Sequence, residues 1–272
     1  MPELPEVETT RRGIEPWCLN HKIRKVEVWQ GALRWPVPGD LAQRLERTAI
    51  HKVDRRGKYL LLHCDSQRLL LHLGMSGSLR ITKATDPRRK HDHWQIALSG
   101  EQALRYHDPR RFGAALVCNE SELDSHKLLR HLGPEPLSKD FNGAHMSLRS
   151  RNRKQAVKNF IMDSRLVVGV GNIYAAEALF AAGIHPARAA GRISLPRYER
   201  LANEIKQVLA KAIESGGTTL RDYVNGSGNP GYFSQQLNVY GKLGEPCPVC
   251  SKPVKSRILG QRSSFYCANC QR

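Results

Sequence analysis

The sequence predicts an α+β protein in which a mainly antiparallel β-domain precedes a helical domain and a C-terminal cysteine-rich module. Three observations support this: one short helical segment opens the chain, six β-type runs follow without intervening helices, and helical periodicity dominates after residue 150. The 272-residue chain is long enough for one large domain or two ordinary ones. Its 40% hydrophobic and 25% charged residues are globular proportions and exclude a wholly disordered chain.

The first domain is expected to span residues 2–135. Leu4, Val7 and Ile14 recur near helical spacing and predict an opening helix that should end at Glu15, before Pro16. The β-type runs that follow are separated by turn sequences, and they predict an antiparallel sandwich or barrel. These runs are Ile23–Trp29, Tyr59–Cys64, Leu69–Leu73, Trp94–Leu98, Ala103–His107 and Ala114–Cys118.

The remaining chain is expected to form a linker at 136–150, a helical domain at 151–237 and a cysteine module at 238–272. An amphipathic helix that stops before Gly216 is predicted by apolar residues on one face, namely Leu201, Ile205, Val208, Leu209 and Ala212. Asn172 is a candidate N-cap of another helix, whose periodic residues are Ile173, Ala176, Leu179 and Phe180.

The charge balance indicates a polyanionic partner. The 43 Lys and Arg residues against 25 Asp and Glu residues give a formal net charge of +18. A protein this basic is expected to bind nucleic acid, an anionic membrane surface or a heparin-like sugar. The longest apolar stretches, such as Leu69–Leu71, are far shorter than the ~20 residues of a membrane-spanning helix.

The start of the chain and its cysteine content predict a reduced, cytoplasmic setting. The opening sequence MPELPEVE is acidic and contains proline, unlike a secretion signal or a transit peptide. Seven cysteines do not fit a secreted disulfide scaffold in a chain of this length. Cys18, Cys64 and Cys118 are therefore expected to be packed as small hydrophobic side chains.

Two CxxC pairs, separated by sixteen residues, form the strongest local motif. This spacing predicts one structural Zn²⁺ held by the thiolates of Cys247, Cys250, Cys267 and Cys270. Four protein ligands leave no position for water, so a catalytic zinc is excluded. Unliganded thiols or two disulfides are the alternatives. The basic residues between the two pairs favour an interpretation in which this module binds a phosphate backbone. The alternative is a basic face that contacts only solvent.

Other motifs have a functional and a purely structural interpretation. The glycines Gly169 and Gly171 predict a tight turn into a helix N-terminus, which could hold a phosphate. The turn Asp108–Gly113 carries two arginines and a phenylalanine, which could insert into stacked bases. A purely structural turn is the alternative for the glycine segment, and an ordinary surface turn is the alternative for Asp108–Gly113. The run His91–His93 lacks acidic or histidine partners at a helpful spacing, so we do not expect it to bind a metal.

Pro2 is a candidate reactive residue, because a small second residue normally allows removal of Met1. Its secondary amine would then lie beside Glu3 and Glu6. An α-amino group titrates near pH ~8, so a neutral fraction remains at pH 7 to attack an acetal carbon and form an iminium. An ordinary chain start is the alternative.

The combination resembles the formamidopyrimidine-DNA glycosylase family along essentially the whole chain. The motifs are PELPEVET at the start, LHLGMSGSL from Leu71, DPRRFG from Asp108, HLGPEPL from His131, VGVGNIYAAEALF from Val168 and the terminal CxxC pairs. PELPE and DPRRFG favour this family over its endonuclease VIII relatives. The resemblance implies an N-terminal helix with a β-sandwich, a helix–two-turn–helix domain and a β-hairpin zinc finger. It also implies a bifunctional repair enzyme that excises 8-oxoguanine and formamidopyrimidines from duplex DNA and cuts the abasic strand by β,δ-elimination.

The resemblance assigns roles to single residues. Pro2 corresponds to the nucleophile, Glu3 to its neighbouring proton donor, Lys58 to the proton donor for β-elimination and Arg262 to that for δ-elimination. DNA contacts are implied for His91, Arg110, Arg153 and Asn172, although the family commonly has Lys where Arg153 stands. Met75, Arg110 and Phe112 correspond to the wedge that fills the gap left by the extruded base. The segment 217–223 falls where the family closes over the lesion.

No redox cofactor or catalytic metal is required, and a monomer is expected. Three other interpretations remain open at this stage. The chain could be a non-catalytic DNA- or RNA-binding zinc protein, a structural component of a nucleoprotein assembly, or an endonuclease VIII-like glycosylase for oxidised pyrimidines.

Overall fold

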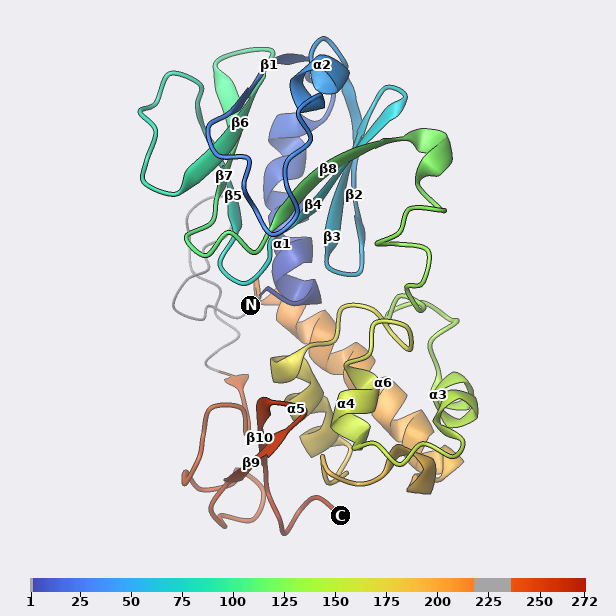
Figure 1. Ribbon diagram of the computed structural model, residues 1–272. Coiled ribbons are helices and arrows are strands. Elements are labelled where there is room, and N and C mark those ends of the chain that lie inside the picture. The colour runs from blue at the N-terminus through green and yellow to red at the C-terminus, as the bar shows by residue number, and fades with distance from the viewer. Residues whose placement is uncertain (1, 218–235) are drawn as a thin grey trace. The chain divides into compact units, whose positions relative to one another are not determined.

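The β-type runs of the first half form two four-stranded antiparallel sheets (Figure 1). One sheet has the order β1 (Ile23–Val28), β6 (Asp92–Leu98), β7 (Gln102–His107) and β5 (Ser78–Lys83). The other has the order β2 (Ile50–Arg56), β3 (Tyr59–Cys64), β4 (Gln67–His72) and β8 (Ala114–Asn119). The α+β class with an antiparallel sandwich is confirmed, and the barrel alternative is wrong because each sheet keeps two edge strands.

The computed structural model describes residues 2–217 and 236–272, which form two compact units. The first unit contains residues 2–130 with 215–217, and the second contains 131–214 with 236–272. No helix within these described residues is both long enough and apolar enough to cross a membrane.

Apolar side chains of both sheets meet in the core of the first unit. Leu60, Leu62 and Leu71 point inward from one sheet, and Ile96 and Leu104 from the other, all at most 1% exposed. Burial of each such side chain contributes about 1.5–3 kcal/mol. Strands β2 and β5 were missing from the sequence prediction because their charged and polar residues interrupt the apolar pattern.

Helix α1 (Leu4–Cys18) lies against both sheets and buries Val7 and Ile14 in the core. It extends beyond the predicted stop at Glu15, so Pro16 is inside its last turn. The helix closes with a 2.9 Å bond from the Leu19 N–H to the Glu15 carbonyl. This extra turn buries Cys18 completely, as predicted for that thiol. Elsewhere in the unit lie α2 (Leu41–Leu45) and the 3₁₀ turn η1 (Glu120–Glu122).

The second unit is helical with one β-hairpin. Its elements are α3 (Gly143–Ser150), α4 (Val157–Ile161), α5 (Asn172–Ala181), η2 (Ala190–Arg192), α6 (Leu195–Glu214), β9 (Lys255–Leu259) and β10 (Arg262–Tyr266). Helix α6 buries Leu201, Ile205, Leu209 and Ala212 and ends before Gly216, as predicted. Helix α3 occupies the end of the stretch expected to be a linker, because Phe141 and Met146 are fully buried there.

Candidate active site and nucleic-acid interface

The start of α1 places Pro2 beside two buried carboxylates. Pro2 is buried, and Glu3 and Glu6 are each 2% exposed. The Glu6 carboxylate accepts a 2.8 Å hydrogen bond from the Glu3 N–H, which forms part of a capping box. Removal of Met1 would turn the Pro2 nitrogen into an amine, and carboxylates next to an amine in a site of low solvent exposure can move protons to and from reacting groups.

Gly217 comes close to this first turn of α1. Its φ of +80° favours glycine, and a Cβ at this position would lie only 3.2 Å from Glu6 Oε1. The sequence prediction placed a lesion-covering loop at 217–223. Gly217 is the described residue of that loop, and 218–223 lie outside the described residues.

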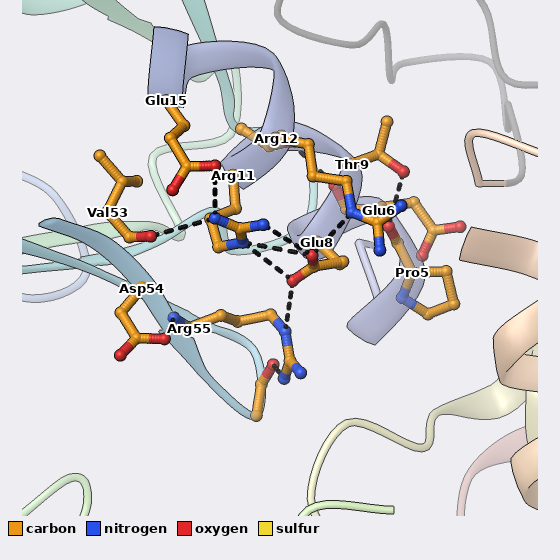
Figure 2. A network of polar contacts seen from close by, with 12 residues as sticks. Pro5, Glu6, Glu8, Thr9, Arg11, Arg12, Glu15, Val53, Asp54 and Arg55 are labelled. Atoms are coloured by element: carbon orange, nitrogen blue, oxygen red, sulfur yellow. Dashed lines mark hydrogen bonds and ion pairs between the residues drawn. The ribbon is translucent and has the colours of Figure 1, made fainter. Parts of the chain in front are cut away.

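A charged network joins α1 to the β2–β3 turn that carries Lys58. Figure 2 shows Glu8 between the guanidinium groups of Arg11, Arg12 and Arg55, with distances of 3.1, 2.9 and 3.1 Å. Burial acts to raise the pKa of Glu8, but the hydrogen bonds and charges of these arginines outweigh it and lower that pKa. Arg55 also donates a 2.8 Å hydrogen bond to the Gly57 carbonyl, directly before Lys58.

Lys58 is half-buried, and its positive charge affects the pKa of the neighbouring His72 imidazole. Burial, followed by the charges of Lys58 and Arg34, lowers the pKa of His72 to about 4. His72 is therefore neutral at pH 7, and its Nδ1 accepts a 3.0 Å hydrogen bond from the Gly74 N–H. The positive charge of Lys58 thus contributes to keeping this imidazole neutral.

The structure brings the three predicted wedge residues together. Met75 and Phe112 line one cavity of about 260 Å³, whose wall also contains Arg34, Trp35, Tyr59, His72, Gly74, Ala114 and Leu128. The Arg110 guanidinium lies 4.9 Å from the centroid of the Phe112 ring, which is 38% exposed. A cation above a partly exposed ring is a surface on which a base can stack.

His91 lies at a strained backbone position with φ +71°, and its ring is 5.9 Å from that of His107. The adjacent Asp92 is fully buried and binds cationic side chains. Its carboxylate contacts the guanidinium groups of Arg80 at 2.5 Å and Arg105 at 3.6 Å, and it also accepts a 3.1 Å hydrogen bond from His107 Nδ1. The burial of the aspartate in the His91–His93 run is therefore explained by its ion pairs.

Asn172 is the first residue of α5, whereas the N-cap is Gly171, so the predicted cap is wrong by one residue. Its side chain makes long-range contacts and does not cap the helix. Asn172 Oδ1 accepts a 2.5 Å bond from Lys158 Nζ, and Nδ2 donates to the Ser263 carbonyl at 3.1 Å. Lys158 also donates to Ser264 Oγ at 2.8 Å. These contacts tie the tight glycine turn to the β9–β10 hairpin.

The other predicted contacts of the second unit are exposed basic side chains. Arg153 borders a cavity of about 260 Å³ together with Arg149 and Arg165. Arg262 is exposed at the first position of β10, where it pairs across the hairpin with Leu259. Arginine at such positions suits bidentate recognition of phosphate.

Four cysteines form the candidate metal site, a cluster in which all four Sγ atoms lie within 4.8 Å of one another. The Cys247–Cys270 and Cys250–Cys267 sulfur distances are 3.9 and 3.4 Å. Zn–S bonds of about 2.3 Å in a tetrahedron require S···S distances of this size, so the donors fit Zn²⁺. Cys247 and Cys267 also pack on α5 through Ala176 and Phe180.

The three other cysteines are buried, as predicted. Burial raises the pKa of both Cys18 and Cys64 to about 12, so neither thiol is a nucleophile near neutral pH.

Several residues that organise these surfaces were missed by the sequence prediction. Glu8 and Arg55 belong to no motif that the sequence analysis singled out, and Asp108 was predicted only as part of a turn. Lys158 carried a usable sequence signal, since it lies among the apolar residues Val157, Phe160 and Ile161 of one short segment. In the structure Lys158 is only 1% exposed. A buried lysine needs partners, which makes such a residue a candidate for a polar network.

Models of protein families match most of the chain. Residues 1–115 match the "Formamidopyrimidine-DNA glycosylase N-terminal domain", and residues 132–224 match the "Formamidopyrimidine-DNA glycosylase H2TH domain". Residues 244–272 match the "Zinc finger found in FPG and IleRS". The zinc-finger match and the sulfur geometry together confirm the prediction of one structural zinc.

Similar proteins cover the chain from end to end. The formamidopyrimidine-DNA glycosylase of Saccharophagus degradans is 57% identical over 272 residues, which are 100% of both chains. A mutant of Lactococcus lactis Fpg in complex with DNA containing Fapy-dG has a TM-score of 0.93 at 33% identity, with 100% of both chains covered. Lactococcus lactis Fpg in complex with DNA containing an abasic site has a TM-score of 0.91 at 32% identity, with 99% of both chains covered.

Proposed function

Because the chain belongs to the formamidopyrimidine-DNA glycosylase family, we propose that it excises oxidised purines through an iminium formed at Pro2. The chain is a DNA glycosylase of base excision repair with abasic-site lyase activity. Duplex DNA that contains 8-oxoguanine, a formamidopyrimidine or an abasic site is its substrate. The Lactococcus lactis complexes with Fapy-dG and abasic-site DNA support this assignment.

The observation that carries the proposal is the buried position of Pro2 next to Glu3 at the start of α1. Once Met1 is removed, the Pro2 nitrogen attacks C1′ of the damaged nucleotide and the glycosidic bond breaks, with its electron pair leaving on the base. The nitrogen then loses its proton, and its lone pair expels the sugar O4′ from C1′ to form the iminium, while O4′ takes up a proton. Glu3 supplies and later recovers protons beside the reacting carbon. The nitrogen of a secondary amine cannot lose the positive charge of the iminium, so the adduct persists as an electron sink.

Strand cleavage follows from this electron sink. The iminium acidifies the C2′ hydrogen, and its removal expels the 3′ phosphate; a second elimination expels the 5′ phosphate and leaves a one-nucleoside gap. We assign proton donation to Lys58, which the Glu8–Arg55 network holds close to α1. Lys58 protonates the departing base and serves again in the first elimination, which depends on it less because the phosphate leaves readily as an anion. Arg262 is assigned to the second elimination, because it is exposed at the tip of the hairpin.

DNA binding is assigned to a set of polar and basic side chains and to the wedge. Phosphate contacts by His91, Arg110, Arg153 and Asn172 add to the non-specific attraction that the net charge of +18 supplies. Extrusion of the damaged nucleotide costs a few kcal/mol, which stacking of Phe112 in the gap offsets. The zinc takes no part in bond breaking and stabilises the module that carries Arg262.

The domain limits 2–135, 151–237 and 238–272 remain our proposal for the functional division of the chain. We also place the enzyme in the cytoplasm on the nucleoid, because its substrate is chromosomal DNA.

Replacement of Lys58 tests the proposed function. Lys58→Ala is expected to slow release of 8-oxoguanine by roughly 10²-fold, while cutting of a preformed abasic site falls much less, since that reaction needs no base expulsion. Single-turnover assays on the two duplexes measure the ratio. Lys52→Ala, which removes an exposed lysine from β2, controls for the lost charge. Equal losses on both duplexes would contradict the assignment.

Replacement of Phe112 tests the wedge. Phe112→Ala should weaken binding to lesion duplex and slow excision roughly 10-fold, because base–aromatic stacking contributes about 1–3 kcal/mol. Cutting at a preformed abasic site should stay largely intact. Trp17→Ala removes another exposed aromatic ring, from α1, and serves as the control. Normal binding and excision by Phe112→Ala would show that the ring is not a wedge.

A further inference from the structure

We propose that Asp108 and Ser76 are positioning residues that join Met75, Arg110 and Phe112 into one preorganised wedge. This inference rests on the proposed function, in which these three side chains fill the gap left by the extruded base. Two turns far apart in the sequence carry them, and the structure shows a buried hydrogen-bond network that locks the turns together.

Asp108 is completely buried and is the centre of the network. Its Oδ1 accepts hydrogen bonds from the Ser76 hydroxyl at 2.6 Å and the Arg110 N–H at 3.2 Å. Its Oδ2 accepts from the Tyr106 hydroxyl at 2.9 Å and the Gly113 N–H at 2.9 Å. An ionised carboxylate only accepts hydrogen bonds and offers about four lone-pair sites, so these donors match its capacity.

The backbone of Asp108 extends the network to a third segment. Its N–H donates to the His91 carbonyl at 3.0 Å, and its carbonyl accepts from His93 Nε2 at 2.6 Å. The segment that contains His91, a proposed DNA contact, is therefore fixed to the same residue as the wedge loop.

Ser76 links the turn of Met75 to the loop of Arg110. Besides donating to Asp108, its hydroxyl accepts the Arg110 N–H at 3.2 Å. Close backbone packing supports the link, because a Cβ on Gly74, where φ is +63°, would lie 2.5 Å from the Phe112 carbonyl carbon. Movement of either turn would therefore break hydrogen bonds or create a clash.

Such a rigid wedge favours insertion because little conformational freedom is lost when it enters the base stack. The stacked Arg110–Phe112 pair then approaches DNA in its final geometry. If the turns were uncoupled, each would have to be ordered at the moment of base extrusion, and lesion recognition would slow. Chemistry at an abasic site needs no base extrusion, so it should depend less on the network.

Two substitutions isolate the network. Ser76→Ala removes the bridge between the turns and keeps the bonds from Tyr106 and Gly113 to Asp108. In Asp108→Asn, either orientation of the amide places its NH₂ against a backbone N–H, that of Arg110 or that of Gly113. Ile50→Val, a conservative change at a fully buried position of β2, controls for general loss of stability.

The experiment compares single-turnover excision of 8-oxoguanine with cutting of a preformed abasic site, in the full chain. We expect Ser76→Ala and Asp108→Asn to lower excision roughly tenfold while cutting of the abasic site changes about twofold or less. Both should also reduce the fluorescence change of 2-aminopurine placed next to the lesion, which reports stacking. Ile50→Val should alter the two reactions equally. Equal effects of the network variants on both reactions would overturn the proposal.

A double-mutant cycle separates this proposal from the wedge assignment. If Ser76 acts through Phe112, the double variant Ser76→Ala/Phe112→Ala should excise no more slowly than Phe112→Ala. Additive losses would overturn the positioning role. Slow excision by Phe112→Ala with normal excision by both network variants would also overturn it and leave the wedge intact. Normal excision by Phe112→Ala would contradict the wedge assignment, and the positioning proposal would fail with it.

Discussion

A chain with any residue ahead of Pro2 is expected to form no covalent adduct with 8-oxoguanine duplex in borohydride, whereas the chain that begins at Pro2 forms one. Borohydride reduces the iminium to a stable amine and so traps protein on DNA. An amide nitrogen cannot attack C1′, so excision should fall roughly 10³-fold or more, the scale of loss when a covalent nucleophile is removed. Peptide mapping of the trapped species should place the adduct on Pro2.

A cleavable N-terminal extension gives the matched control. Removal of the extension should restore trapping in the same preparation, and duplex binding should persist throughout, since the proposed cationic contacts lie elsewhere in the chain. An adduct on Lys58 would refute the assignment of Pro2 as the nucleophile, whereas the assignment of lyase activity would stand. The absence of any adduct from folded, DNA-bound protein would favour a non-catalytic DNA-binding protein.

Cys247→Ser should lose zinc and duplex affinity together. The four sulfur atoms lie within 4.8 Å of one another, and the module packs on α5 through Cys247 and Cys267. Without the metal this small module loses the main interaction that folds it, and Arg262 loses its fixed position. We expect affinity for an abasic-site duplex to fall roughly 10-fold or more through the lost phosphate contacts.

Metal analysis and fluorescence anisotropy with labelled duplex measure the two quantities. Cys118→Ser changes a buried cysteine of β8, outside the module, and should keep both zinc and DNA affinity. Full lesion binding by zinc-free Cys247→Ser protein would contradict the proposal that zinc organises a DNA contact.

The elements with a clear local pattern were predictable. Helix α6 has apolar residues at helical spacing followed by Gly216, and β3 and β4 are short apolar runs bounded by turns. Strand β2 was not predictable in this way, because the sequence IHKVDRR contains two apolar residues among charged ones. Its assignment depends on pairing with β3, which the local sequence does not encode.

The residues of the candidate site likewise include some that were predictable from local motifs and some that were not. The CxxC spacing predicted the four metal ligands, because both knuckles are local motifs. The N-cap at Asn172 was misplaced because its amide bonds Lys158 and Ser263, 14 and 91 residues away in the sequence. Local propensity favours a cap at such an asparagine, and these distant partners override it.

The sequence by itself determined the fold class, the zinc ligands, the polyanionic partner and, through its motifs, the family. These properties depend on composition, on spacing within short segments, or on the order of motifs along the chain. Only the tertiary structure decided which polar groups meet: Glu8 with Arg55, Lys158 with Asn172, and Asp108 with Ser76. The physical reason is that a buried charge is stable only where packing supplies its partners, and those partners come from distant parts of the chain.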